Sequence, residues 1–191
     1  MRRLVDRFMR RYAEGQAADV APFIEGPRLL DLGAGEGYVA AALARRGQRA
    51  VCADVGPFRR VPIPYVVYDG RRLPFRDATF DTTFVLLRLH HCAAPEATLD
   101  EAIRVTRGRL IVTESVYRSR AERFWLRTLD GRLNRFRHNG TMAPALEFGT
   151  PGCWTSLFAS RRLRTLATRW LGRWWERLVH HPLLYVLERT A

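Results

Sequence analysis

Three glycines at alternate positions are the residues of this chain whose spacing points most directly to chemistry. Gly33, Gly35 and Gly37 lie in the run LLDLGAGEG at residues 29–37, between an apolar stretch and an Ala-rich stretch. Glycine adopts positive φ angles and lets a ligand touch the backbone. A helix that starts directly after the loop also presents unpaired N–H groups to a ligand. The sequence therefore predicts a loop that holds a nucleotide-like ligand.

Two acidic residues narrow the choice of ligand. The third glycine comes one residue too early for the G-x-G-x-x-G pattern of dinucleotide-binding folds, and no Lys follows as in the phosphate-binding G-x-x-x-x-G-K-[ST] loop. Asp31, just before the glycines, would repel a pyrophosphate but suits an ammonium or sulfonium group. Asp54 follows the loop by about twenty residues, where a carboxylate can accept both hydroxyls of a ribose. The alternatives for Asp54 are a solvated strand-end acid and a helix cap.

The run D-x-G-x-G-x-G, with a strand before it and a helix after it, resembles motif I of the class I S-adenosylmethionine-dependent methyltransferases. DGRRLPFRDATFD at residues 69–81 resembles the D-x-x-x-L-P-F-x-D-x-x-F-D segment of the methyltransferase-11-like branch. Residues 86–115 resemble that branch's L-H-H turn, its helix with E-x-x-R-V and the following strand. FGTPGCWTSLF at residues 148–158 is similar to a further segment of the same branch.

The resemblance implies S-adenosyl-L-methionine as cofactor, with S-adenosyl-L-homocysteine as product. In that family the residue matching Asp69 lies by the adenine amino group, and the residue matching Gly70 lines the adenine ring. We therefore expect a set of cofactor-binding residues from the glycine loop and the strand ends that follow it: Asp31, Gly33, Ala34, Gly35, Gly37, Asp54, Val55, Asp69, Gly70 and Leu86.

His90, His91 and Glu114 are candidates for proton transfer. They follow predicted strands, and ligands of open α/β sheets bind at the carboxyl ends of strands. Histidine, with a pKa of about 6.5, can take a proton from a phenol, alcohol or acid. We predict His91 as the base and Glu114 as a second base or a substrate anchor. The alternatives are helix capping and packing for the histidines, and a salt bridge for Glu114. Cys92 beside them lacks a second spaced pair of ligands, so we predict no metal site.

The acceptor is expected to bind under an inserted helical lid at about residues 116–148, which is rich in Arg and aromatic residues. Aromatic walls and basic groups there suit an aromatic or anionic small molecule. The alternatives are core packing for the aromatics and a solvated face for the basic run. The predicted substrate-binding residues are His90, Phe124, Trp125, His138 and Trp154.

The elements that position these residues alternate between strand and helix, which indicates a mainly parallel sheet with helices on both faces. We expect a single doubly wound α/β domain over residues 1–191, a three-layer αβα structure. The resemblance implies seven strands in the order 3-2-1-4-5-7-6. Prolines between Asp54 and the third strand exclude a long crossover helix there. The predicted strands are 28–32, 50–53, 65–68, 82–87, 110–113, 163–170 and 183–188, and the main helices are 38–46, 95–105 and 151–160.

Two further glycines are expected to interrupt elements. Gly15 should end an N-terminal helix at residues 2–12, with a second helical turn at 18–24. Gly108 should form a tight turn into the strand at 110–113. Thr150 and Pro151 should begin a helix, Thr as the cap and Pro at the first helical position.

Composition limits the classes of function. The chain has 191 residues, of which 47% are hydrophobic, enough for one sizeable core. It contains no apolar run of about 18 residues and no signal-like start, so we expect no transmembrane segment. Three scattered cysteines indicate a reducing cytoplasm. The net charge is +13, and all 32 basic residues are Arg, spread along the chain. That pattern favours a generally basic surface over a nucleic-acid site and leaves an anionic substrate or membrane surface open.

These observations predict methyl transfer to an oxygen, nitrogen or carbon atom of a small molecule, in bacterial specialised or secondary metabolism. Two alternatives remain: an RNA methyltransferase that uses the basic surface, and a non-catalytic binding subunit with the same fold. The oligomeric state is expected to be monomer or homodimer.

Overall fold

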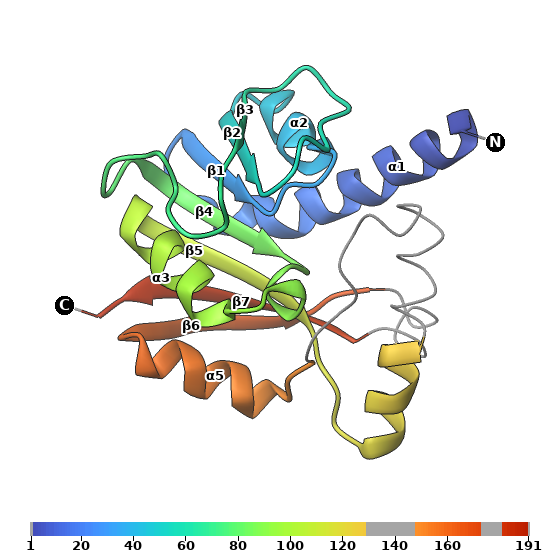
Figure 1. The fold of residues 1–191 in the computed structure, drawn as a ribbon, viewed down its shortest axis with the longest axis vertical. Helices are drawn as coiled ribbons and strands as arrows, with labels where there is room; N and C mark the ends of the chain where they lie inside the picture. The colour runs from blue at the N-terminus through green and yellow to red at the C-terminus, as the bar shows by residue number, and fades with distance from the viewer. Residues whose placement is uncertain (1, 129–147, 173–180, 191) are drawn as a thin grey trace. The chain divides into compact units, whose positions relative to one another are not determined.

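The computed structural model describes residues 2–128, 148–172 and 181–190, shown in Figure 1. Most of the predicted lid at residues 116–148, including His138, lies outside the described residues. The chain forms two compact units. The first contains residues 1–86 and 100–111, and the second contains residues 87–99 and 112–191.

Seven strands form one sheet in the order β3-β2-β1-β4-β5-β7-β6. Strand β1 pairs in parallel with β2 and with β4, and β2 pairs in parallel with β3, whereas β6 and β7 are antiparallel. The predicted mainly parallel α/β sheet and its strand order are confirmed. The strands are β1 Arg28–Leu32, β2 Arg49–Asp54, β3 Tyr65–Val67, β4 Phe80–Leu86, β5 Thr106–Ser115, β6 Leu163–Trp170 and β7 Pro182–Arg189.

The first unit contains α1 (Arg2–Val20), a 3-10 turn η1 (Ala21–Phe23) and α2 (Tyr38–Ala44). Helix α2 packs against α1 and against strands β1 and β2. The predicted break at Gly15 is wrong, because α1 runs through it as one helix. Packing of one face of the helix stabilises it on both sides of this glycine. The buried residues of that face are Met9, Ala13, Ala17 and Val20.

Strand β5 begins earlier than expected. Helix α3 (Pro95–Val105) passes directly into β5, and Gly108 lies inside the strand instead of in a turn before it. A Cβ at Gly108 would come within 2.6 Å of the backbone oxygen of Asp81. The glycine therefore allows close approach of two backbones, a role that glycine also has in strands.

The second unit contains the 3-10 turn η2 (Leu89–His91), a helix at residues 120–128, α5 (Pro151–Ser160) and the β6–β7 pair. As predicted, Thr150 caps the start of α5, and its side chain accepts a hydrogen bond from the Cys153 N–H at 3.2 Å. Helix α5 packs along β6 (Figure 1). Among the described residues, no helix is long and apolar enough to cross a membrane.

Candidate cofactor and catalytic site

The glycine loop follows β1 and is attached to the end of β2. The N–H groups of Gly33 and Ala34 donate to the Ala53 carbonyl at 2.8 and 3.3 Å. All three glycines of the loop have positive φ angles. A Cβ at Gly35 would meet no protein atom within 4 Å. Packing inside the protein therefore does not require a glycine at this position, although its φ of 52° favours one.

Two side chains outside the loop determine its shape. The Asp54 carboxylate is buried and accepts hydrogen bonds from the N–H of Gly35 at 2.8 Å and of Val55 at 2.7 Å. The Tyr65 hydroxyl lies 3.0 Å from the Gly35 carbonyl and 3.1 Å from the Gly56 carbonyl. Sequence reasoning identified Asp54 but missed Tyr65, because an aromatic residue at the start of a strand carries no signal of such a bond.

Asp31 lies in β1 and is buried. The pKa of its carboxyl group is raised to about 8, mainly by burial and also by the negative charge of Asp54, against the lowering effect of the Ala40 N–H. Ionisation of Asp31 in the folded protein therefore costs free energy. A ligand with a positive charge would relieve that cost, whereas an anionic ligand would increase it.

The ends of β2 and β3 provide a small surface of mixed character. Val55 leaves 49% of its surface exposed beside Gly70, where a Cβ would come within 3.3 Å of a Val55 methyl group. Asp69 is exposed, and its Oδ1 accepts from the N–H groups of Arg71 and Arg72 at 2.8 and 3.0 Å, which lowers its pKa. Asp69 thus organises the turn that precedes the LPF segment at residues 73–75. The remaining predicted contact, Leu86, is half-buried at the end of β4.

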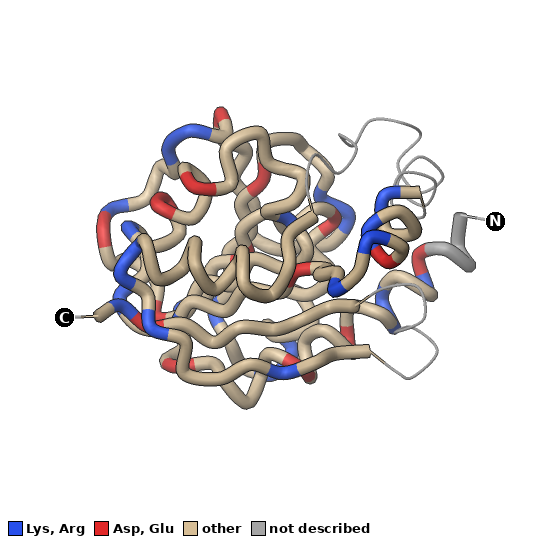
Figure 2. The backbone as a smooth tube through the Cα atoms, turned by 90° about the horizontal axis from the view of Figure 1, so that it is seen from below, with Lys and Arg blue, Asp and Glu red and all other residues tan. Residues whose placement is uncertain are grey.

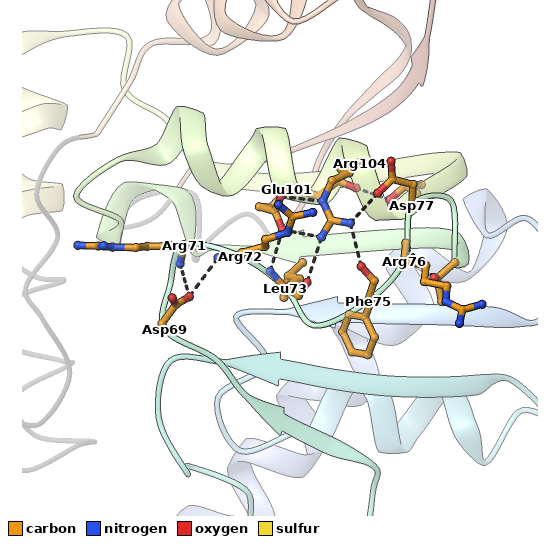
Figure 3. A network of polar contacts seen from close by, with 12 residues as sticks. Asp69, Arg71, Arg72, Leu73, Phe75, Arg76, Asp77, Glu101 and Arg104 are labelled. Carbon is orange, nitrogen blue, oxygen red and sulfur yellow. Dashed lines mark hydrogen bonds and ion pairs between the residues drawn. The ribbon is translucent and has the colours of Figure 1, made fainter.

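One arginine holds the LPF segment at residues 73–75 in place (Figure 3). The Arg104 guanidinium donates to the carbonyls of Leu73 and Phe75 at 3.0 and 2.8 Å. It also pairs with Glu101 through two bonds of 2.7 Å, and Glu101 accepts from the Leu73 N–H at 2.7 Å. Sequence reasoning noted the E-x-x-R pattern but missed this role. The planar guanidinium provides several donors in fixed directions, which a lysine would not.

Glu114 is fully buried in the second unit and is surrounded by donors. Its Oε1 accepts from the N–H groups of Arg88 and Leu89 at 3.1 and 2.7 Å, and its Oε2 lies 2.5 Å from Nδ1 of His90. Leu87 has a φ of 54°, and this turn of the chain directs the next two N–H groups toward the carboxylate. Glu114 is therefore placed to orient the His90 ring.

The two histidine rings differ in accessibility. His90 is buried, stacks on Phe148 with ring centres 4.9 Å apart, and lies 4.2 Å from the ring centre of His91. His91 is only half-buried. Tyr185 is also buried here, and burial, together with the charge of Glu114, raises the pKa of its hydroxyl. Of the two histidines, His91 is the more exposed.

The remaining predicted substrate-binding residues differ in exposure. Trp154 is buried in α5, where it stacks on Phe158 with ring centres 6.3 Å apart. Phe124 and Trp125 lie on the helix at residues 120–128 and leave 63% and 57% of their surface exposed.

Comparison with known proteins identifies similar sequences and folds. Residues 30–112 match a family model described as a methyltransferase domain. A demethylmenaquinone methyltransferase of Beutenbergia cavernae is 40% identical over 98 residues, which cover 47% of this chain and 41% of that protein. This chain therefore matches less than half the length of that relative.

Solved structures share the fold. An S-adenosylmethionine-dependent methyltransferase of Aquifex aeolicus has a TM-score of 0.64 at 14% identity, covering 94% of this chain and 93% of the other. The geranyl diphosphate C-methyltransferase of Streptomyces coelicolor, solved with S-adenosyl-L-homocysteine, Mg²⁺ and geranyl diphosphate, has a TM-score of 0.71 at 13% identity, covering 94% and 80%. The predicted resemblance is thus confirmed: residues 30–112 match a methyltransferase domain, and the chain has the fold of the S-adenosylmethionine-dependent methyltransferases.

Proposed function

We propose that this chain transfers the methyl group of S-adenosylmethionine to a small-molecule acceptor that carries a ring hydroxyl, of the phenol or hydroquinone class. The observation that carries the proposal is the glycine loop: space lies open at Gly35, and the buried acid Asp31 precedes the loop. The cofactor supplies a methyl group that its sulfonium already activates. The protein must therefore align donor and acceptor and exclude water.

The residues of the loop region fit this cofactor. Asp31 suits its ammonium and sulfonium charges, because a nearby cation stabilises a carboxylate whose pKa burial has raised. The exposed Val55 beside Gly70 offers an apolar surface to a flat base. The predicted ribose contact is assigned to Asp54, which also holds the loop. The predicted contacts of Gly33, Ala34, Gly37, Asp69 and Leu86 with the cofactor are part of the same proposal.

In the second unit, we assign the proton transfer to His91. A phenolic hydroxyl has a pKa of about 10 and is a poor nucleophile until it loses its proton. With Glu114 ionised, Nδ1 of His90 must carry the proton of their 2.5 Å hydrogen bond, because a carboxylate only accepts. This bond holds the His90 ring beside His91. Glu114 and His90 are therefore positioning residues, and His91 is the base.

The acceptor class draws on the comparisons as well as on the histidines. The relative from Beutenbergia cavernae is named for a demethylated quinone. Residues 30–112, which match the methyltransferase family model, contain the glycine loop, Asp54 and both histidines. A reduced quinone carries ring hydroxyls, and removal of one proton makes both the oxygen and the adjacent ring carbon more nucleophilic. This chemistry requires the base that His91 provides.

The first experiment is calorimetric titration of the full chain with S-adenosylmethionine and S-adenosylhomocysteine. We expect binding of both, and loss of binding in Gly35→Ala, whose methyl group would occupy the ligand space. Gly47→Ala is the matched control, because Gly47 also has a positive φ and open space around its Cβ. Both variants place an alanine at a positive φ, which costs about 1–2 kcal/mol. Absence of binding to the unaltered chain, or equal loss in both variants, would contradict the cofactor assignment.

The second experiment measures methyl transfer to reduced naphthoquinones, substituted phenols, primary amines and an RNA oligonucleotide. We expect product only with the hydroxylated rings. His91→Ala should lower kcat by about 10²-fold or more and remove the decline in rate at acidic pH. Turnover of amines alone, or an unchanged pH profile in the variant, would refute the acceptor class or the role of His91.

A further inference from the structure

The helix at residues 120–128 leaves most of its surface uncovered by the described part of the chain. It begins a few residues after β5 ends at Ser115, in the second unit. Leu126 is buried and attaches the helix to the unit, whereas Arg120, Phe124, Trp125 and Arg127 are exposed. Two large aromatic side chains exposed side by side are uncommon on a soluble surface and indicate an interaction site.

Helical spacing arranges these residues into two adjacent stripes. At about 100° per residue, Arg120, Arg123 and Arg127 fall on one line of the helix. Phe124 lies next to that line and Trp125 beyond it. The three arginines, Phe124 and Thr128 line one open concavity. The exposed face thus carries guanidinium groups on one side and aromatic rings on the other.

Two arginines of this face, Arg120 and Arg127, have no acidic partner among the described residues. Glu122, the acid of the same helix, pairs instead with Arg118 at 3.6 Å and lies 4.0 Å from His181. Figure 2 shows basic positions along this helix. The concavity therefore suits an anionic group.

A second pair of an arginine and an aromatic residue continues the surface. The Arg118 guanidinium lies 5.6 Å from the ring centre of Trp170, which ends β6 and leaves 40% of its surface exposed. Because Arg118 also contacts Glu122, this pair adjoins the helix at residues 120–128. The exposed aromatic surface thus includes three rings, of which Phe124 and Trp170 lie near arginine side chains.

We propose that this face, formed by residues 118–128 and Trp170, docks on an anionic lipid bilayer. Arginine extends toward lipid phosphates while its aliphatic stem covers apolar surface, and tryptophan and phenylalanine bind at the bilayer interface. Phe124 and Trp125 pack edge to face with ring centres 5.6 Å apart. The edge of one ring thus covers a face of the other, which reduces the area for stacking of nucleobases and leaves apolar edges to insert between headgroups. The inference does not depend on the methyl acceptor.

The test is sedimentation of the full chain with vesicles of phosphatidylcholine alone and of phosphatidylcholine mixed with phosphatidylglycerol. We expect binding only to the mixed vesicles, and release by salt. Each arginine near an anionic surface contributes about fivefold in affinity, so Arg120→Ala with Arg127→Ala should weaken binding about 25-fold. Phe124→Ser with Trp125→Ser should also weaken binding to the mixed vesicles, although this variant keeps the net charge of the unaltered chain.

Arg49→Ala with Arg76→Ala is the matched control, because it removes the same charge from exposed positions near the starts of β2 and β4. We expect this variant to bind vesicles nearly as well as the unaltered chain. Equal weakening in the two arginine variants would show attraction by net charge alone and overturn the assignment of this face. Equal binding to neutral and anionic vesicles, or binding to an RNA oligonucleotide but to neither vesicle, would also overturn it. Thermal unfolding and cofactor titration of each variant identify loss of folding separately from loss of docking.

Discussion

Asp31 offers a test in which stability and ligand binding change in opposite directions. Its pKa in the folded protein is about 8, against 3.8 for an unperturbed aspartate, mainly because it is buried and also because Asp54 is negatively charged. Between these two values the folded state binds a proton that the unfolded chain has released. Stability must therefore fall as pH rises from about 4 to about 8, and the protein is penalised most at and above pH 8.

The magnitude follows from the two pKa values. A tenfold change in proton affinity corresponds to about 1.4 kcal/mol, so the full penalty above pH 8 is on the order of 6 kcal/mol. Asp31→Asn removes the charge but keeps a carbonyl that can accept from the Ala40 N–H. Because the amide also loses hydration when buried, we expect it to recover about 2–3 kcal/mol. For a chain of this size that raises Tm by about 4–10 °C at alkaline pH.

Cofactor binding should respond in the opposite sense. A cationic ligand favours the ionised carboxylate, so binding releases a proton, and affinity should rise up to about tenfold per pH unit below pH 8. Asp31→Asn should bind S-adenosylmethionine about 10- to 100-fold more weakly, as expected for loss of a buried charged hydrogen-bonding partner, and without this pH dependence.

The assay is thermal unfolding of cofactor-free protein across acidic to alkaline pH, combined with calorimetric titration over the same range. Glu96→Gln serves as the control, because Glu96 is an exposed carboxylate in the first turn of α3 and should change neither pH profile. A lower Tm of Asp31→Asn at every pH, with the pH dependence of the unaltered chain retained, would refute the reasoning that burial penalises this charge.

Three further predictions concern the residues that support the site. Arg104→Lys should lose about 2–3 kcal/mol of stability and weaken cofactor binding, because a single nitrogen does not reproduce the separate contacts of the guanidinium with Glu101 and the Leu73 and Phe75 carbonyls. Denaturant unfolding measures this loss, and an unchanged midpoint would contradict it. Tyr65→Phe should raise the Kd for the cofactor with little change in kcat, since it releases the Gly35 carbonyl; a fall in kcat alone would argue against a loop-supporting role. Glu114→Gln still accepts from two backbone N–H groups but donates to Nδ1 of His90, so kcat should fall about 10²-fold with KM unchanged, and a shift in KM alone would exclude a positioning role.

Local sequence determined much of this protein. The alternate glycines and the apolar runs predicted the loop and the strands beside it, because backbone conformation there depends on the residues themselves. The Thr150-Pro151 pair predicted the start of α5 for the same reason, since capping involves only neighbours within one turn. The chemistry of Asp31 was also visible in the sequence, because its place before the glycines does not change with folding.

Tertiary structure decided what depends on distant partners. Gly108 resembled a turn in the sequence, but its approach to the Asp81 backbone keeps it inside β5. Glu114 was a candidate base, but the N–H groups of residues 88 and 89 and the ring of His90 enclose it. Arg104 was one of many arginines until the carbonyls of the LPF segment were placed against it. In each case the decisive contact joins residues more than twenty positions apart, and no local pattern encodes such a contact.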